Sequence, residues 1–433
     1  MAEVNTRRRA VFLIVLGFLG LLSVAFLILY VASQLPAPTP STPPPQATAP
    51  APNSGVDVAP RGPLSPPLPL AGGASPLASG SDLFGAVEVG GSGIKGTVFR
   101  LTKEQVRSLL AEVEQERGFR YTAFEKARVK QYDDLNTKLK DPQNTNVAAD
   151  YAEKLVRQMY ADFAITPDRV YVVLSSGVAS LTHVNAIKQA IYNRTKITPG
   201  VVTASEECRL TFDWLVPGGR ALDAAVVDIG SQNTKACYKE ATSDGLRPRS
   251  FEMMPWGVKS FESKVNESKS PTEPFEVASE GSRAELIQLV SAAASGNTGL
   301  RARKRLYMVG GAVWAAATLV RPNEALVQWV RLSVPNDFVT LRVRAVANRG
   351  FDVDLSQSSS EDIRAAAQKD VEKLKTTYTR EQLISAMDIL ISISEGLHAR
   401  EEKEAVYFGR PSAYGWMSRY LLEHLAEDKS EMP

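Results

Sequence analysis

Two stretches of this chain share one layout: AVEVGGSGIKGTVF at residues 86–99 and AVVDIGSQNTKACY at residues 225–238. In each, an apolar strand reaches a carboxylate, Glu88 or Asp228, a Gly-containing polar turn follows, and a second strand leads away. Such a turn exposes successive backbone N–H groups, which together bind anionic oxygens. The nearby carboxylate can hold a hydrated Mg²⁺ that shields phosphate charge. Either turn alone is typical of an ordinary glycine hairpin, but two facing copies predict a binding site for a phosphate chain.

Outward from these turns, short β-branched runs alternate with longer runs of helical period, which is an α/β pattern. The expected strands lie at residues 86–89, 170–174, 224–228, 306–309 and 405–408. The expected helices lie at residues 103–117, 147–163, 182–193, 206–215, 283–294, 312–319, 361–376, 381–397 and 412–424.

The composition excludes several classes of protein. Lys and Arg number 50 against 48 Asp and Glu, so no global field attracts nucleic acid and no nucleic-acid partner is expected. Two cysteines exclude a disulfide-rich scaffold and a four-cysteine zinc site. These cysteines, Cys208 and Cys237, are either two separate buried side chains or one disulfide formed in an oxidising compartment.

The N-terminal region predicts a membrane anchor. Residues 10–32 carry no charge and, as a helix rising ~1.5 Å per residue, reach ~34 Å, enough to cross a ~30 Å hydrocarbon layer. A cleaved signal peptide is the alternative, although its apolar region usually spans only ~7–15 residues. Arg7, Arg8 and Arg9 precede the span and the next basic residue is Arg61, so residues 1–9 are expected in the cytoplasm and the main domain outside it. The lipid bilayer is therefore an expected partner of this single-pass protein.

Between the anchor and the main domain lies a Pro-rich segment. Residues 36–80 hold 14 of the 26 prolines, mixed with Ala, Ser, Thr and Gly. Such a composition buries too little apolar surface to fold, so residues 33–80 are expected to be a disordered linker.

The two turns and the segments around them resemble the exopolyphosphatase / guanosine pentaphosphate phosphohydrolase (Ppx/GppA) family of the actin-like ATPase superfamily. The segment EVGGS at residues 88–92 is similar to the family motif DxGSNS, and DIGSQNT at residues 228–234 to DIGGGST. VVTASEECRLTF at residues 201–212 is similar to VISGEEARLIF, and LYMVGGAVWAAATLV at residues 306–320 to a strand-turn-helix containing GGT.

This resemblance covers residues 82–425 and implies two ribonuclease-H-like (actin/Hsp70-like) lobes around a phosphate-binding cleft. Lobe I is expected at residues 81–200, and lobe II with the C-terminal helices at residues 201–433. The implied reaction is removal of the terminal phosphate from polyphosphate or a related phosphorylated anion, with Mg²⁺ held by Glu88 and Asp228. Those two acids and Glu207, the implied base, are the expected catalytic residues. The expected phosphate-binding residues are Gly90, Gly91, Ser92, Gly93, Gly230, Ser231, Gln232, Asn233, Thr234, Lys235, Gly310 and Gly311.

Three departures from the family pattern leave the function open. Glu88 replaces an Asp, which shifts its carboxylate by ~1 Å, and such a shift can cost ~100-fold in rate. Lys235 stands where the family has a Glu that helps to carry the metal, so a repulsion replaces an attraction for Mg²⁺, although a lysine can contact phosphate directly. The helix after Leu174 also lacks the family's Arg. Two hypotheses remain: a membrane-anchored phosphohydrolase, and a catalytically degenerate binding or sensor protein of the cell envelope. A homodimer is among the expectations for either.

Overall fold

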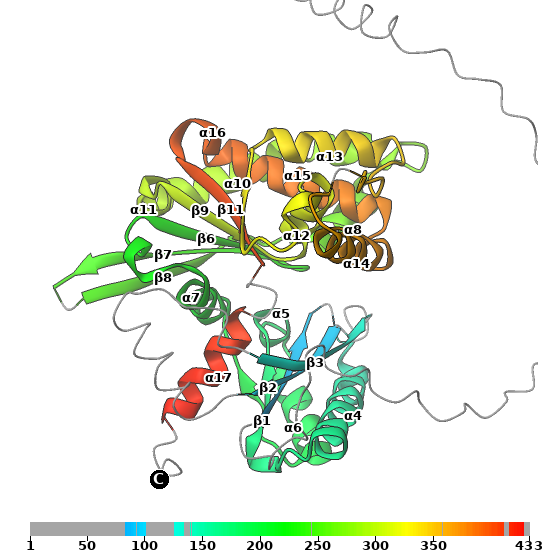
Figure 1. The fold of residues 1–433 in the computed structure, drawn as a ribbon, viewed down its shortest axis with the longest axis vertical. Coiled ribbons are helices and arrows are strands. Elements are labelled where there is room, and N and C mark those ends of the chain that lie inside the picture. Colours follow the sequence, from blue (N-terminus) through cyan, green and yellow to red (C-terminus); the bar gives the residue numbers. More distant parts are fainter. Residues whose placement is uncertain are drawn as a thin grey trace, which may run out of the picture. The chain divides into compact units, whose positions relative to one another are not determined.

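The computed structural model describes residues 83–91, 93–100, 125–133, 139, 141–243, 245–356, 358–410 and 415–427, all within one compact unit of the chain (Figure 1). The predicted anchor (10–32), the predicted linker (33–80), the helix expected at residues 103–117 and Ser92 lie outside the described residues. Across the described ranges, no helix is both long enough and apolar enough to span a bilayer.

The first sheet, sheet A, has the strand order β3-β2-β1-β4-β5. Strands β1 to β3 are antiparallel, and β4 and β5 continue parallel to β1. A helix approaches this sheet closely at Gly85, where a Cβ would lie 2.5 Å from the sulfur of Met159. The strands of sheet A are β1 (Leu83–Gly90), β2 (Gly93–Arg100), β3 (Glu125–Asp133), β4 (Val170–Leu174) and β5 (Gly200–Val201), and the helices packed on one face are α4 (Thr145–Phe163) and α6 (Val184–Thr195).

The second sheet, sheet B, has the order β10-β11-β9-β6-β7-β8. Its strands are β6 (Ala224–Ile229), β7 (Thr234–Thr242), β8 (Gly245–Met254), β9 (Arg305–Val309), β10 (Trp329–Leu332) and β11 (Ala405–Gly409). Its helices are α8 (Val258–Ser268), α9 (Phe275–Gly281), α10 (Arg283–Gly296), α11 (Thr298–Ala302), α12 (Gly311–Val320), α13 (Asn336–Val346), α14 (Glu361–Thr377), α15 (Arg380–Gly396) and α16 (Ala399–Glu402). Every residue of α15 from 383 to 394 is buried, which makes it the central helix of this core.

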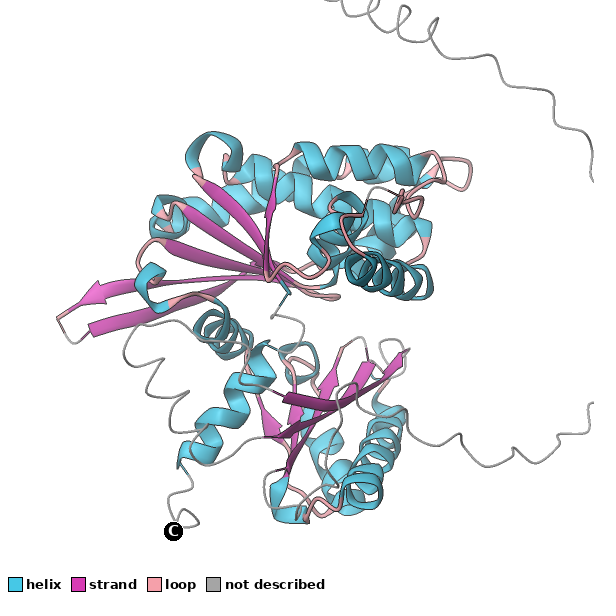
Figure 2. Ribbon diagram, in the orientation of Figure 1, coloured by secondary structure: helices cyan, strands magenta, loops and turns pink. Residues whose placement is uncertain are grey.

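The two sheets repeat one topology. In each, a three-stranded antiparallel segment (β1-β2-β3 or β6-β7-β8) is extended by a parallel strand beside its first member, β4 or β9 (Figure 2). The register is also equivalent, since Glu88 pairs with Lys95 in the first hairpin and Asp228 pairs with Lys235 in the second. The repeated layout of the sequence thus corresponds to a repeated element of the fold.

Two helices connect the sheets. Helix α7 (Ala204–Leu215) follows β5 and precedes β6, and Thr203 caps its first turn by accepting a hydrogen bond from the Glu206 amide. Helix α17 (Gly415–Glu427) follows β11 and packs against α7 and sheet A. Arg209 of α7 donates to both carboxylate oxygens of Glu423, at 3.0 and 2.9 Å. The last helix of the chain therefore covers a face of the first sheet.

Most elements expected from the sequence are present. All of the expected strands occur, and the expected helices within the described ranges begin or end within a few residues of their predicted bounds. The sequence prediction did not include the strands β3, β5, β8 and β10 or the helices α5 (Ser176–Ala179), α8, α9, α11, α13 and α16. Their runs are short or strongly polar; β8, for example, is exposed or half-buried over most of its length, so its apolar periodicity is weak.

Candidate functional site

The two hairpins each place a lysine opposite their carboxylate. The Nζ atom of Lys95 lies 3.4 Å from Oε2 of Glu88, and that of Lys235 lies 3.2 Å from Oδ2 of Asp228. In both hairpins the lysine follows its acid by seven residues in the sequence. Sequence reasoning missed Lys95, although this shared spacing was the signal that could have found it.

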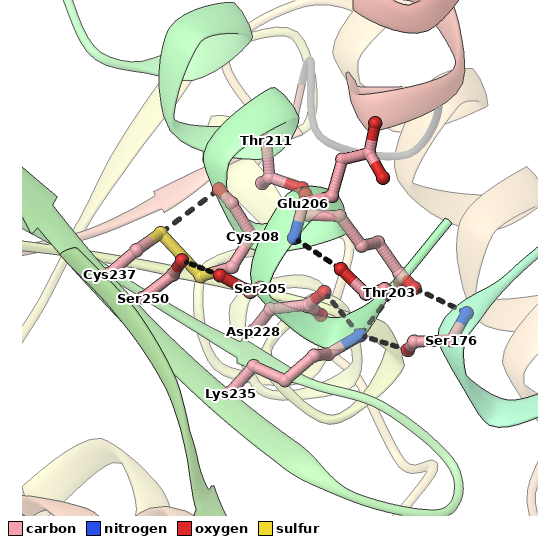
Figure 3. The surroundings of a disulfide bond; sticks show 11 residues. Ser176, Thr203, Ser205, Glu206, Cys208, Thr211, Asp228, Lys235, Cys237 and Ser250 are labelled. Atoms are coloured by element: carbon pink, nitrogen blue, oxygen red, sulfur yellow. Dashed lines mark hydrogen bonds and ion pairs between the residues drawn. A yellow bond between two sulfur atoms is a disulfide. The ribbon is translucent and has the colours of Figure 1, made fainter. Parts of the chain in front are cut away.

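Lys235 lies at the centre of a buried polar cluster. Its Nζ atom donates to Oε1 of Glu207 at 2.7 Å and to Oγ of Ser176 at 3.3 Å. It also pairs with Asp228, and Figure 3 shows Lys235 directed toward Asp228 and Ser176. The side chain of Lys235 is only 3% exposed. The Lys235 ammonium group therefore contacts three elements: a carboxylate of α7, a carboxylate of β6 and a hydroxyl of α5 (Ser176–Ala179), the short helix that follows β4.

Glu207 is buried in the first turn of α7 and is not a surface acid. Its Oε1 accepts from Lys235, and its Oε2 accepts a hydrogen bond of 2.9 Å from the backbone amide of Ser176. Both carboxylate oxygens of the predicted base are thus occupied by partners within the protein.

The charges of both hairpins act on one another. The neighbouring Glu88 carboxylate raises the pKa of Lys95 against the effect of burial, and Glu207 and Asp228 add to this rise. Acids of both hairpins therefore act on the charge of Lys95. Burial, assisted by the negative charge of Glu207, raises the pKa of Asp228 although Lys235 opposes the change.

Glu207 and Lys235 stabilise one another in their charged forms. Burial alone would raise the pKa of Glu207, but Lys235 and the hydrogen bonds from Ser176 together outweigh it, so the pKa of Glu207 is lowered. Burial alone would lower the pKa of Lys235, but Asp228 and Glu207 outweigh it and the pKa is raised. The pair is therefore an ion pair across the ordinary pH range, with a weakly basic carboxylate.

The two turns meet at α5. A Cβ on Gly177 would lie 3.7 Å from the backbone of Gly91 in the first turn and 4.0 Å from the side chain of Gln232 in the second. In the second turn, the carbonyl of Ser231 accepts hydrogen bonds from the amides of Lys259 and Ser260. In the part of the chain that the structure describes, no acceptor is recorded for the amides of Ser231 and Gln232. The N–H groups of this turn are candidate donors to an anion.

Other predicted phosphate-binding residues serve the fold. The hydroxyl of Thr234 donates to the carbonyl of Trp256, and Nδ2 of Asn233 donates to Glu252 at 2.9 Å. Gly310 has a φ of +101°, and a Cβ there would lie 2.0 Å from the carbonyl oxygen of Ile229, so this position requires glycine. Gly230 and Gly310–Gly311 lie together at the ends of β6 and β9, whereas Gly90 and Gly93 close the first hairpin. Their role in binding phosphate stays a prediction.

The donor set does not fit the Mg²⁺ expected from the sequence, because each acid expected to hold it already pairs with a lysine, Glu88 with Lys95 and Asp228 with Lys235. The Lys235 ammonium lies within hydrogen-bond distance of both Glu207 and Asp228, in the place where a cation bridging these acids would lie. Among the described side chains, no group of three or more His, Cys, Asp or Glu residues is arranged to hold a metal ion.

Cys208 and Cys237 form a disulfide, with a Cα–Cα distance of 6.0 Å (Figure 3). Of the two alternatives that the sequence left open, the bonded one applies. The disulfide joins α7 to β7, directly after Glu207 and two residues after Lys235. It thereby fixes the helix that carries the acid against the strand that carries the lysine.

Comparison with solved structures identifies the fold. The Ppx/GppA family member from Aquifex aeolicus is 12% identical, with a TM-score of 0.51 over 80% of this chain and 98% of that one. A structure described as an exopolyphosphatase-like protein is 12% identical, with a TM-score of 0.50 over 78% of this chain and 99% of that one. No family model and no curated protein sequence matches the chain. The resemblance to Ppx/GppA proteins is therefore confirmed at the level of the fold, a mixed α/β structure with two sheets.

Proposed function

We propose that this chain is a membrane-tethered binding protein of the cell envelope that recognises a phosphorylated anion without hydrolysing it. The observation that carries this proposal is the pairing of Glu207 with Lys235. A general base needs an accessible oxygen with a pKa near the working pH. Both oxygens of Glu207 are already hydrogen-bonded, and its pKa is lowered. Freeing this carboxylate would leave a buried charge without its partner, which costs about 3–5 kcal/mol.

Anion binding is supported by the groups that remain available around the two turns. The side chain of Lys95 is 30% exposed, and its contact with Glu88 is a long one, so it can turn to an incoming anion. The amides of Ser231 and Gln232 lack recorded acceptors in the described structure. Three carboxylates and two ammonium groups leave the cluster with an excess of one negative charge, so an anion must be held by the Lys95 ammonium and by backbone N–H groups of the turns. An extended anion that reaches both turns contacts more of these donors, and polyphosphate is the first candidate because a solved structure of this fold is named for it.

Hydrolysis of the terminal phosphate is the second candidate. The fold supports it, and so does the position of Glu207 beside Asp228, where a base for an attacking water would be needed. A reaction would require Glu207 to leave Lys235 when substrate binds. A measurement of tripolyphosphate binding and phosphate release on the same samples distinguishes binding without hydrolysis from hydrolysis.

The full-length protein in detergent is expected to bind tripolyphosphate and to release no phosphate from it. Binding is measured by calorimetry with and without MgCl₂, and release by a phosphate assay on the same samples. The Lys95→Gln variant is expected to bind about tenfold or more weakly, because a charge-assisted hydrogen bond contributes ~1.5–3 kcal/mol. Phosphate release by the wild type should equal that of Glu207→Gln.

A matched control removes an exposed lysine of α14 with the same change of charge. Lys369→Gln should bind tripolyphosphate as the wild type does. Equal weakening by both substitutions would show a nonspecific charge effect and sink the binding proposal. Magnesium-dependent release that disappears in Glu207→Gln would establish hydrolysis instead.

The location outside the cytoplasm is part of the same proposal. The uncharged run at residues 10–32 and the arginines before it support an anchored protein with its main domain outside. The disulfide is an independent argument, since such bonds persist in oxidising compartments and are rare in the cytosol. The homodimer expected from the sequence stays a prediction.

A reporter enzyme that works only after export is expected to be active when fused after Pro433. The fusion is compared with one to a reporter that works only in the cytoplasm, which should be silent. Activity of the cytoplasmic reporter alone would overturn the proposed topology. Deletion of residues 10–32 should transfer the protein from the membrane fraction to the soluble fraction.

A further inference from the structure

We infer that Lys235 takes the place of a divalent cation between Glu207 and Asp228, so that the site excludes metal and becomes a metal site only when Lys235 is removed. This inference does not depend on whether a phosphorylated anion binds. It concerns the positive charge that holds the two acids together, which this chain supplies from its own strand β7.

The distances carry the first step. The Lys235 Nζ atom lies 2.7 Å from Glu207 Oε1 and 3.2 Å from Asp228 Oδ2. Magnesium binds carboxylate oxygens at ~2.0–2.1 Å, so an ion bridging the same oxygens would occupy the volume of the ammonium group. The lysine and the metal therefore exclude each other.

The second step is that Lys235 cannot move aside. Its side chain is 3% exposed, and its backbone is paired within the β6–β7 hairpin, directly opposite Asp228. The disulfide at Cys237 holds the same strand to α7. Lys95, at the equivalent position of the first hairpin, is 30% exposed and lies 3.4 Å from its acid. Only the second hairpin has a cation held in place by burial.

The third step concerns charge. Glu207 and Asp228 bear two negative charges that Lys235 reduces to one, and a further divalent ion would meet an ammonium group at contact distance. Without the lysine, the two carboxylates and the hydroxyl of Ser176 would surround an open position of suitable chemistry, because hard divalent ions prefer oxygen ligands. The oxygen ligands of a metal site are thus present, and the Lys235 ammonium group fills the position between them.

The test is Mn²⁺ binding to the full-length protein in detergent, without any phosphate compound, followed by electron paramagnetic resonance. The wild type is expected to bind no more Mn²⁺ than its Asp228→Asn variant. Lys235→Ala is expected to bind at least about tenfold more tightly than the wild type, since a repulsion is removed from the site. The added substitution Asp228→Asn should abolish that gain.

Lys95→Ala is the matched control, because it removes a lysine beside an acid at the equivalent position of the other hairpin and should gain no Mn²⁺ site. Far-ultraviolet circular dichroism checks that each variant is folded. Should Lys235→Ala not fold without metal, it is refolded with Mn²⁺, and recovery of the fold supports the inference. Failure to bind or refold with Mn²⁺ overturns it, as does a wild-type protein that binds Mn²⁺ through Asp228.

Discussion

Replacing Lys235 with alanine is expected to lower the free energy of unfolding by about 3–5 kcal/mol, because the substitution leaves buried acids without their counter-charge. Glu207 and Asp228 are 6% and 8% exposed, so water cannot replace the missing ammonium group cheaply. The hydroxyl of Ser176 also loses its contact with Lys235. Urea denaturation followed by tryptophan fluorescence measures the change.

The equivalent lysine of the first hairpin is the control for this prediction. Lys95→Ala should change the free energy of unfolding by no more than about 1 kcal/mol, since a partly exposed ion pair contributes little. Combining Lys235→Met with Glu207→Gln and Asp228→Asn should recover most of the loss, because neutral groups of similar size then replace the whole set of charges. Equal effects of the two lysine substitutions would contradict the central position of Lys235.

Removing the disulfide is expected to lower the free energy of unfolding by about 3–4 kcal/mol. The bond closes a loop with a sequence separation of 29, and a loop of this size restricts the unfolded chain by that amount. The change is made with Cys208→Ala and Cys237→Ala together, since both side chains lie in an apolar cluster that tolerates alanine. Urea denaturation with and without a reductant compares the variant with the wild type.

The reductant provides the internal control for the cysteine variant. The wild type should become less stable when reduced, whereas the double variant should be insensitive to the reductant. When the wild-type protein is unfolded without reductant and its thiols are titrated, neither Cys208 nor Cys237 should react as a free thiol. Two free thiols together with an unchanged stability would show that the protein as purified lacks the bond.

These two expectations concern one junction. Lys235, Cys237 and Asp228 belong to the β6–β7 hairpin, and Glu207 and Cys208 to α7. The ion pair and the disulfide therefore join the same two elements by independent means. A site held in this way favours binding to a preformed surface over a reaction that requires Glu207 to move.

Much of the fold was predictable because its signals are local. The alternation of β-branched and helical runs located the inner strands of both sheets, and the repeated order of acid, turn and strand located both hairpins. The largely exposed β8 was not predicted, because a strand in contact with solvent needs no regular apolar pattern, and β10 was not predicted because its four residues are too few to show a period. The glycines likewise predicted the position of each turn.

The sequence by itself determined that Glu88 and Asp228 each stand before a glycine turn, because the turn and its acid are neighbours along the chain. Only the tertiary structure decided what those acids contact. Lys235 meets Glu207 across 28 residues and Ser176 across 59, and no periodicity records a pairing between side chains on different elements. The acid predicted as the base is therefore paired with Lys235, and so is Asp228, one of the two acids predicted to hold Mg²⁺, because burial of the acids demands a positive charge and the nearest strand supplies it.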